Sequence, residues 1–200
     1  MMTELLLASN NEHKTREFAR LFPGLRILVP RDLGIVFDFP EDGETFFANA
    51  HGKAAALHRA AGRPVIADDS GLCVECLGGE PGIRSARYGS APGGPVLDAP
   101  RRNEYLLSRM HGLTARGARF VCCLVLLLGA DRFLSAQETV DGVITESPRG
   151  IHGFGYDPLF FLPAAGVTMA ELSDPDKDRI SHRGRAARRI LAFLKESEWT

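Results

Sequence analysis

Residues 64–71 read Pro64-Val65-Ile66-Ala67-Asp68-Asp69-Ser70-Gly71. The apolar run predicts a short buried strand that ends at two adjacent aspartates, followed by a serine and a glycine, which are typical of turns. Open α/β sheets bind ligands at the carboxyl ends of their strands, so acids at this point indicate a functional site. Because neighbouring carboxylates repel each other, the pair needs a metal ion, a cationic partner or a shared proton. A solvated Asp-Asp-Ser-Gly turn is the alternative that this stretch alone leaves open.

The composition is that of an ordinary folded protein. A chain of 200 residues, 44% hydrophobic and 24% charged, suits one large domain over residues 1–200, with or without two lobes. A formal net charge of −1 gives no general attraction for nucleic acid or an anionic membrane, so neither partner is expected. The apolar runs 5–8 and 120–130 are too short for a signal peptide and a membrane span, which predicts a cytoplasmic protein.

The hydrophobic pattern predicts an α/β fold. Residues 120–129 have the continuous apolar character of a strand buried on both faces at the centre of a sheet, and 133–140 should pair with it as an antiparallel hairpin. Gly62 should end the second helix, and Thr168 and Glu171 form a capping box. The other expected strands are 4–8, 26–29 and 72–77, and the expected helices are 12–22, 44–61, 98–110 and one that opens at 181–184.

The four cysteines are Cys73, Cys76, Cys122 and Cys123. The first two have the spacing of a zinc or redox motif, but the second two are adjacent rather than spaced. All four lie in apolar, strand-like surroundings, where cysteine behaves as a small hydrophobic residue. The sequence therefore favours a packing role for them.

Polar residues outside the regular elements suggest a nucleoside triphosphate site. Asn10 or Asn11 can cap a helix whose first amides, with Lys14, would cradle a phosphate, although a capped surface helix has the same pattern. Acids at 41, 42 and 44 and at 68–69 are suited to Mg²⁺, and any of the first three has the reach for it. The Gly-aromatic loop 150–158 offers flat faces for a base. No Walker motif is present in the sequence.

In these motifs the chain closely resembles the Ham1/inosine triphosphatase family of non-canonical purine nucleoside triphosphate pyrophosphatases, nearly from end to end. The matching segments are Ala8 to Lys14, Thr45-Phe46, Asn49-Ala50, Lys53-Ala54, Ile66 to Leu72, Leu77 to Gly79, Pro81-Gly82, Ser85 to Tyr88, Gly153 to Pro158, Ala170 to Leu172 and Ser181 to Gly184.

The resemblance implies a fold, an activity and an assembly. The fold would be an elongated mixed β-sheet with two helix-bearing lobes that flank a central active-site cleft. The activity would be Mg²⁺-dependent hydrolysis of ITP, dITP and XTP to the monophosphate and pyrophosphate, and the chain would form a homodimer.

The resemblance also implies roles for individual residues. Asp69 would be the base that activates water, with Glu41 and Asp69 serving the metal. Asp68 is left open as a second metal ligand, as a structural partner of Asp69 or as the base itself. The residues that would bind substrate are Ser9, Asn10, Asn11, Glu12, His13, Lys14, Lys53, Ser70, Phe154, Gly155, Tyr156, Asp157, Lys177, His182 and Arg183.

Base selection has a physical rationale in this set. Hypoxanthine and xanthine carry an acceptor at position 6, where adenine carries a donor. Donors from His182 and Arg183 would therefore suit the first two bases and leave adenine's amino group unpaired. Two other functions stay open: a related pyrophosphatase for other modified nucleotides, and a non-catalytic sensor of abnormal purine nucleotides.

Overall fold

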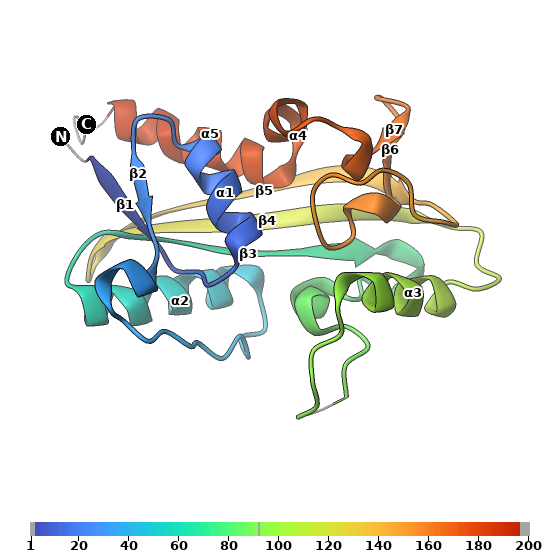
Figure 1. Cartoon of the computed structure of the whole chain (residues 1–200), viewed down its shortest axis with the longest axis horizontal. Helices are drawn as coiled ribbons and strands as arrows, with labels where there is room; N and C mark the ends of the chain where they lie inside the picture. The colour runs from blue at the N-terminus through green and yellow to red at the C-terminus, as the bar shows by residue number, and fades with distance from the viewer. Residues whose placement is uncertain (1–2, 92, 197–200) are drawn as a thin grey trace. The chain divides into compact units, whose positions relative to one another are not determined.

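The computed structural model describes residues 3–91 and 93–196. A seven-stranded sheet has the order β2-β1-β3-β4-β5-β6-β7. Its strands are β1 (Glu4–Leu7), β2 (Arg26–Leu28), β3 (Val65–Val74), β4 (Gly117–Gly129), β5 (Arg132–Ile144), β6 (Phe160–Leu162) and β7 (Val167–Thr168). The α-helices are α1 (Glu12–Leu21), α2 (Phe46–Ala61), α3 (Ala99–Arg109), α4 (Asp174–Ile180) and α5 (His182–Glu196) (Figure 1).

The sheet is mixed, which confirms the predicted α/β class. β1 pairs in parallel with β2 and with β3, and Leu6 is the partner of both Leu28 and Val65. β6 pairs antiparallel with β5 and with β7. β4 and β5 are neighbours joined by residues 130–131 alone, a connection that only an antiparallel hairpin permits. The apolar run at 120–129 is therefore part of the predicted central strand.

The structure divides into two compact units. Unit 1 comprises the described residues of Met1–Asp69, Cys122–Glu138 and His182–Thr200, and unit 2 comprises Ser70–Val121 and Thr139–Ser181. The division falls between Asp69 and Ser70, inside β3, and it also falls inside β4 and β5. Each unit has a hydrophobic core of its own.

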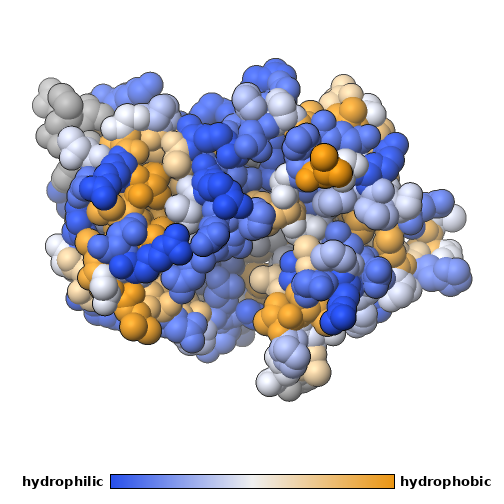
Figure 2. Space-filling view, viewed as in Figure 1, coloured by the Kyte–Doolittle hydropathy of each residue, from blue (hydrophilic) through white to orange (hydrophobic). Residues whose placement is uncertain are grey.

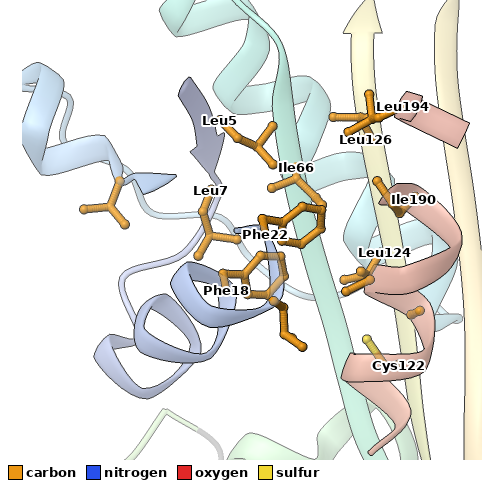
Figure 3. Close-up of a cluster of buried hydrophobic side chains, with 14 residues drawn as sticks. Leu5, Leu7, Phe18, Phe22, Ile66, Cys122, Leu124, Leu126, Ile190 and Leu194 are labelled. Carbon is orange, nitrogen blue, oxygen red and sulfur yellow. The ribbon is translucent and has the colours of Figure 1, made fainter. Parts of the chain in front are cut away.

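The sheet of unit 1 is covered by helices on both faces. Successive side chains of a strand point to opposite faces. Leu5, Leu7 and Ile66 thus pack with Phe18 of α1 and Ile190 of α5, and all five are fully buried (Figure 3). The alternate residues of the same strands pack with α2 in a second cluster, which includes Leu6, Val65, Ala67, Ala54 and Leu57. In Figure 1, α1 and α5 lie on one side of these strands and α2 lies on the other.

The ends of the unit 1 helices follow from local sequence. The Asn11 side chain accepts hydrogen bonds from the backbone amides of His13 and Lys14 at the start of α1. Thr45 caps α2 in the same way. Gly62 ends α2 in the left-handed conformation at φ 64°, as predicted, because a glycine adopts this conformation without steric cost.

The core of unit 2 lies between α3 and its segments of the sheet. Leu106 of α3 packs with Leu72, Phe120 and Phe160, and the rings of the two phenylalanines have centroids 4.4 Å apart. The predicted capping box is confirmed: the Thr168 backbone amide donates to Glu171 Oε2 over 2.6 Å. The face of the molecule in Figure 2 is mostly hydrophilic, with smaller hydrophobic areas. Among the described residues, no helix has the length and apolar character needed to cross a membrane.

Candidate active site

Asp68 and Asp69 lie in the middle of a strand. The prediction that a strand ends at Ala67, with a turn at Ser70-Gly71 and a new strand over 72–77, is wrong. β3 is continuous from Val65 to Val74. Its pairing with β1 is confined to Val65 and Ile66, and its other neighbour is the long strand β4, whose pairing outweighs the local turn preference. The solvated-turn alternative also fails, since the two aspartates are only 2% and 3% exposed.

The two aspartates face opposite sides of the sheet. Asp68 shares its face with Ile66, which packs against α1 and α5, whereas Asp69 shares its face with Val65 and Ala67, which pack against α2. Cations from these helices meet each acid. Alternation along a strand thus separates the two carboxylates, and each has partners of its own.

On its side, the Asp68 carboxylate is held by two cations. Lys14 Nζ of α1 lies 2.7 Å from Oδ1, and Arg183 Nε of α5 lies 2.6 Å from Oδ2. Arg183 Nη1 also contacts Glu17 Oε2 at 2.5 Å, and the Cys122 thiol lies 3.6 Å from Asp68 Oδ2. Burial alone would raise the pKa of Asp68, but Arg183 and Lys14 outweigh it and hold that pKa well below its usual range. Asp68 is therefore an ionised member of a buried ionic network.

On the other side, Asp69 lies beside α2. Its Oδ2 accepts a hydrogen bond from Asn49 Nδ2 over 3.0 Å, and its Oδ1 is 3.6 Å from Lys53 Nζ. Lys53 Nζ also lies 2.5 Å from Glu41 Oε1 and donates to the Asp68 carbonyl over 2.6 Å. Burial raises the pKa of Asp69, and the nearby Glu41 raises it further against the opposing effect of Lys53. A carboxylate with a raised pKa is suited to accept a proton.

The predicted phosphate cradle at the start of α1 has a local hydrogen-bonding pattern. Ser9 Oγ accepts from the Asn11 amide over 3.1 Å, and the Asn11 side chain caps the helix. Asn10 Nδ2 donates to the Phe37 carbonyl over 2.7 Å. Glu12 and His13 are exposed and lie beside Arg31 and Arg16 respectively. Of the six residues predicted here, Lys14 is the one that contacts the Asp68 network.

The Gly-aromatic loop and Lys177 come together within unit 2. Asp157 Oδ2 accepts from the Phe154 backbone amide over 2.8 Å and from Lys177 Nζ over 2.7 Å, and Lys177 Nζ lies 4.9 Å from the centroid of the Phe154 ring. The Tyr156 hydroxyl donates to the Ser85 carbonyl, and Asn103 Nδ2 donates to the Gly155 carbonyl. These contacts fix the loop that carries the predicted base-stacking ring.

Lys177 lies in a short helix that is absent from the helices expected from the sequence. It belongs to α4, where the Ser173 side chain caps the helix and Pro175 occupies the first turn. The missing N–H of proline costs no intrahelical hydrogen bond in the first turn, and its fixed φ suits a helix start. His182 and Arg183 open α5 as predicted, and both are buried. Ser70 directly follows Asp69 in β3.

Three residues of the buried network were not predicted as part of the site: Glu17, Asn49 and Cys122. Glu17 lies three residues after Lys14, which places the two side chains on one face of α1. Asn49 lies one turn before Lys53 on α2, and this helical spacing could have indicated that Asn49 lies beside Lys53 in the network. Cys122 reaches Asp68 only through the pairing of β3 with β4, which the local sequence does not reveal.

No group of three or more His, Cys, Asp or Glu side chains positioned to hold a metal occurs among residues 3–91 and 93–196. Two carboxylates, those of Glu41 and Asp69, do converge on the Lys53 ammonium, and the Glu41 side chain is 27% exposed. Mg²⁺ in nucleotide enzymes is typically held by one or two protein carboxylates together with substrate phosphates and water. This pair fits that kind of site.

The fold and these clusters define a mixed α/β protein in which two ionic networks surround β3. One joins Asp68 to Lys14 and Arg183, and the other joins Asp69 and Glu41 to Lys53. A model of the Ham1 family matches residues 5–193, and the chain belongs to that family. It is 52% identical over 194 residues to the dITP/XTP pyrophosphatase of Treponema denticola, covering 97% of this chain and 100% of that protein.

Solved structures agree with the fold. The Staphylococcus aureus Ham1 protein is 40% identical and superposes with a TM-score of 0.86, covering 97% of this chain and 99% of that one. A HAM1 protein from Coxiella burnetii is 35% identical, also with a TM-score of 0.86, covering 98% of this chain and 100% of that one. The predicted family and fold class are therefore confirmed.

Proposed function

We propose that this chain hydrolyses the non-canonical purine nucleoside triphosphates ITP, dITP and XTP to the monophosphate and pyrophosphate, and so cleanses the nucleotide pool. Membership of the Ham1 family supports this, as do nearly full-length relatives named dITP/XTP pyrophosphatase. The structural observation that carries the proposal is the cluster of Glu41, Lys53 and Asp69, where a buried base candidate, a second acid and a cation meet.

In the proposed reaction, Asp69 takes a proton from the attacking water. The water oxygen forms a bond to the phosphoryl group, and the bond to the pyrophosphate leaving group breaks. The buried position of Asp69 favours this role, because burial raises its pKa. Asn49 and Lys53 orient the carboxylate from the α2 side. Asp68 is the weaker candidate for the base, since two cations already hold it ionised.

We assign the proposed metal site to Glu41 and Asp69. Asp68 fits it less well, because it faces the other side of the sheet and both of its oxygens accept from cations. Bound Mg²⁺ would neutralise charge on the phosphate oxygens. Lys14 and Lys53 would add positive charge near the triphosphate, together with Ser9, Asn10, Asn11, Glu12, His13 and Ser70.

The purine would be bound by Phe154 to Asp157, Lys177, His182 and Arg183. Asp157 fixes the backbone of the Phe154 loop, which supports a defined stacking surface. Asp68 and Glu17 hold the Arg183 guanidinium in one orientation, which supports its role as a directed donor to an acceptor on the base. A fixed donor disfavours adenine, which presents its own donor at position 6.

We propose that the chain acts as one domain, that it forms a homodimer, and that it works in the cytoplasm. A sedimentation experiment tests the second directly, with a mass of about twice 21.8 kDa expected for the dimer.

The activity is tested by separating the products of ITP hydrolysis with and without Mg²⁺. We expect inosine monophosphate and pyrophosphate in equal amounts with Mg²⁺, and no turnover when EDTA removes the metal. Orthophosphate as the first product would indicate a stepwise phosphatase instead. Binding of ITP without any product would favour the nucleotide sensor.

The Phe154 loop provides a test of base binding with a matched control. Gly153 and Gly155 both have left-handed φ values, of 71° and 65°. A Cβ atom at Gly153 would collide with Asp157 Oδ2, whereas one at Gly155 would meet nothing within 4 Å. Both alanine substitutions thus carry backbone strain, but only one displaces the side chain that fixes the loop.

We expect Gly153→Ala to raise KM for ITP about 10-fold or more relative to Gly155→Ala, as a loss of about 1.4 kcal/mol in binding would. Steady-state kinetics on both variants provide the measurement. Equal KM values for the two variants would show that Asp157 does not organise a substrate-binding loop.

A further inference from the structure

We propose that Asn49 is a positioning residue that holds the segment carrying Glu41 in a fixed position relative to the Asp69 carboxylate. This inference rests on the proposed function, because it concerns the geometry of the two acids assigned to that reaction. It adds a residue to which the sequence analysis gave no role. The structural basis is the buried side-chain amide of Asn49, which makes one hydrogen bond to Gly43 and one to Asp69.

Asn49 is 1% exposed on the inner face of α2. Its Nδ2 donates to Asp69 Oδ2 over 3.0 Å, and its Oδ1 accepts from the backbone amide of Gly43 over 2.9 Å. The Gly43 amide is a donor and therefore requires the oxygen of Asn49, which leaves the nitrogen to face the carboxylate. The two contacts thus fix the orientation of the side chain uniquely.

The segment 35–45, which carries Glu41, contains neither helix nor strand. Side-chain amides hold it at two points: Asn10 Nδ2 donates to the Phe37 carbonyl, and Asn49 Oδ1 accepts from the Gly43 backbone amide. Glu41 lies between these two points in the sequence and contacts Lys53. Since an irregular segment has no hydrogen-bond ladder of its own, these side-chain contacts set where Glu41 lies.

Close packing against α2 reinforces this attachment. A Cβ atom at Gly43 would lie 2.7 Å from Asn49 Oδ1 and 3.0 Å from Ala48 Cβ, so the backbone approaches the helix as only a glycine allows. A Cβ atom at Gly52 would lie 2.5 Å from the ring of Phe39 in the same segment. The segment is therefore seated on the helix that also carries Asn49 and Lys53.

The consequence is a mechanical link between the two acids. Asp69 belongs to the sheet and Glu41 to an irregular segment. Asn49 makes one hydrogen bond to Asp69 and one to the backbone amide of Gly43, two residues after Glu41. Groups that orient the ligands of a metal or a reacting centre typically change activity by about 10- to 100-fold when they are lost. We expect that range here, in kcat rather than in KM for the nucleotide.

The test uses three variants, and its control is a substitution on α2, the helix that carries Asn49. Asn49→Leu removes both hydrogen bonds at similar volume, whereas Asn49→Asp keeps the acceptor for Gly43 and replaces the donor to Asp69. Gly43→Ala leaves Asn49 in place and forces the segment away. The control is Leu57→Ala, which opens a cavity beneath α2 among fully buried residues without touching the acids.

Two measurements are made on each protein: steady-state pyrophosphate release from ITP, and backbone hydrogen exchange over 35–45 without nucleotide or metal. All three variants should lose kcat by about 10- to 100-fold with little change in KM. Exchange of the backbone amide at position 43 should accelerate in Asn49→Leu and Gly43→Ala but stay slow in Asn49→Asp. The control should unfold at a lower temperature and keep the wild-type kcat and exchange.

The inference is overturned if Asn49→Leu keeps kcat within about twofold of wild type, or if Leu57→Ala shares the loss of kcat, since any loosening of α2 would then suffice. Unchanged exchange at Gly43 in Asn49→Leu would overturn it as well. A wild-type chain that releases no pyrophosphate would instead refute the proposed function. The exchange experiment would still decide whether Asn49 anchors the segment.

Discussion

Replacing Asp69 by Asn is expected to lower kcat for pyrophosphate release from ITP by about 10²- to 10⁴-fold, the range that a positioned general base contributes. The substitution keeps the volume of the side chain and its place in β3, so the fold should survive. It removes the basic oxygen that would take the proton from water. The raised pKa of Asp69, caused first by burial and then by Glu41, is what makes this carboxylate the stronger base of the pair.

The measurement is steady-state kinetics on wild type, Asp69→Asn and Asp131→Asn as the matched control. Asp131 is exposed in the turn between β4 and β5, so its substitution should leave kcat unchanged. Circular dichroism and a melting curve establish that each protein is folded. An Asp69→Asn variant with more than about a tenth of the wild-type kcat would rule out Asp69 as the base.

Replacing Arg183 by Met is expected to lower the free energy of unfolding by about 3–5 kcal/mol, the usual cost of removing one partner from a buried ion pair. Arg183 is 3% exposed and contacts both Asp68 and Glu17. Without it, the buried Asp68 would keep its contact with Lys14 but lose its contact with Arg183, and the buried Glu17 would lose the Arg183 charge. Arg185→Met, on an exposed position of the same helix, is the control and should cost less than about 1 kcal/mol.

The loss should depend on pH in a defined direction. The folded-state pKa of Asp68 is depressed, so its pairing stabilises the protein above the ordinary aspartate pKa and the effect disappears as pH falls through the folded value. The difference between wild type and Arg183→Met should therefore be largest near neutral pH and shrink below about pH 4. Urea unfolding across this range measures it. A difference that grows as the pH falls would contradict the assigned network.

Much of the fold could be predicted because periodicity and caps agree with the final structure. The helix predicted over 44–61 lies at Phe46–Ala61, and its glycine stop is where expected. β3 could not be predicted correctly, because Ser70 and Gly71 favour a turn locally while pairing with the neighbouring strand β4 favours an extended conformation. Tertiary pairing overrides a turn preference of this size.

The sequence selected candidate site residues but could not predict their arrangement. Motif matching selected Asp68 and Asp69, yet only a continuous strand places their side chains on opposite faces, beside different helices. Asn49 was visible in the sequence as a polar residue one turn from Lys53, but its two partners come from a loop and a strand that no helical pattern identifies. Contacts between elements, rather than local spacing, define these roles.

The choice of substrate is tested by measuring pyrophosphate release from ITP, XTP, ATP and GTP at equal concentration with Mg²⁺. We predict turnover of ITP and XTP at rates that exceed that of ATP by about two orders of magnitude or more, as expected when a buried donor faces the amino donor at position 6 of adenine. Guanine carries the same acceptor at position 6 as hypoxanthine, so this contact does not separate GTP from ITP. Cleavage of ATP at the same rate as ITP would contradict the discrimination assigned to His182 and Arg183, and cleavage of GTP at that rate as well would contradict the proposed role in removing non-canonical purines.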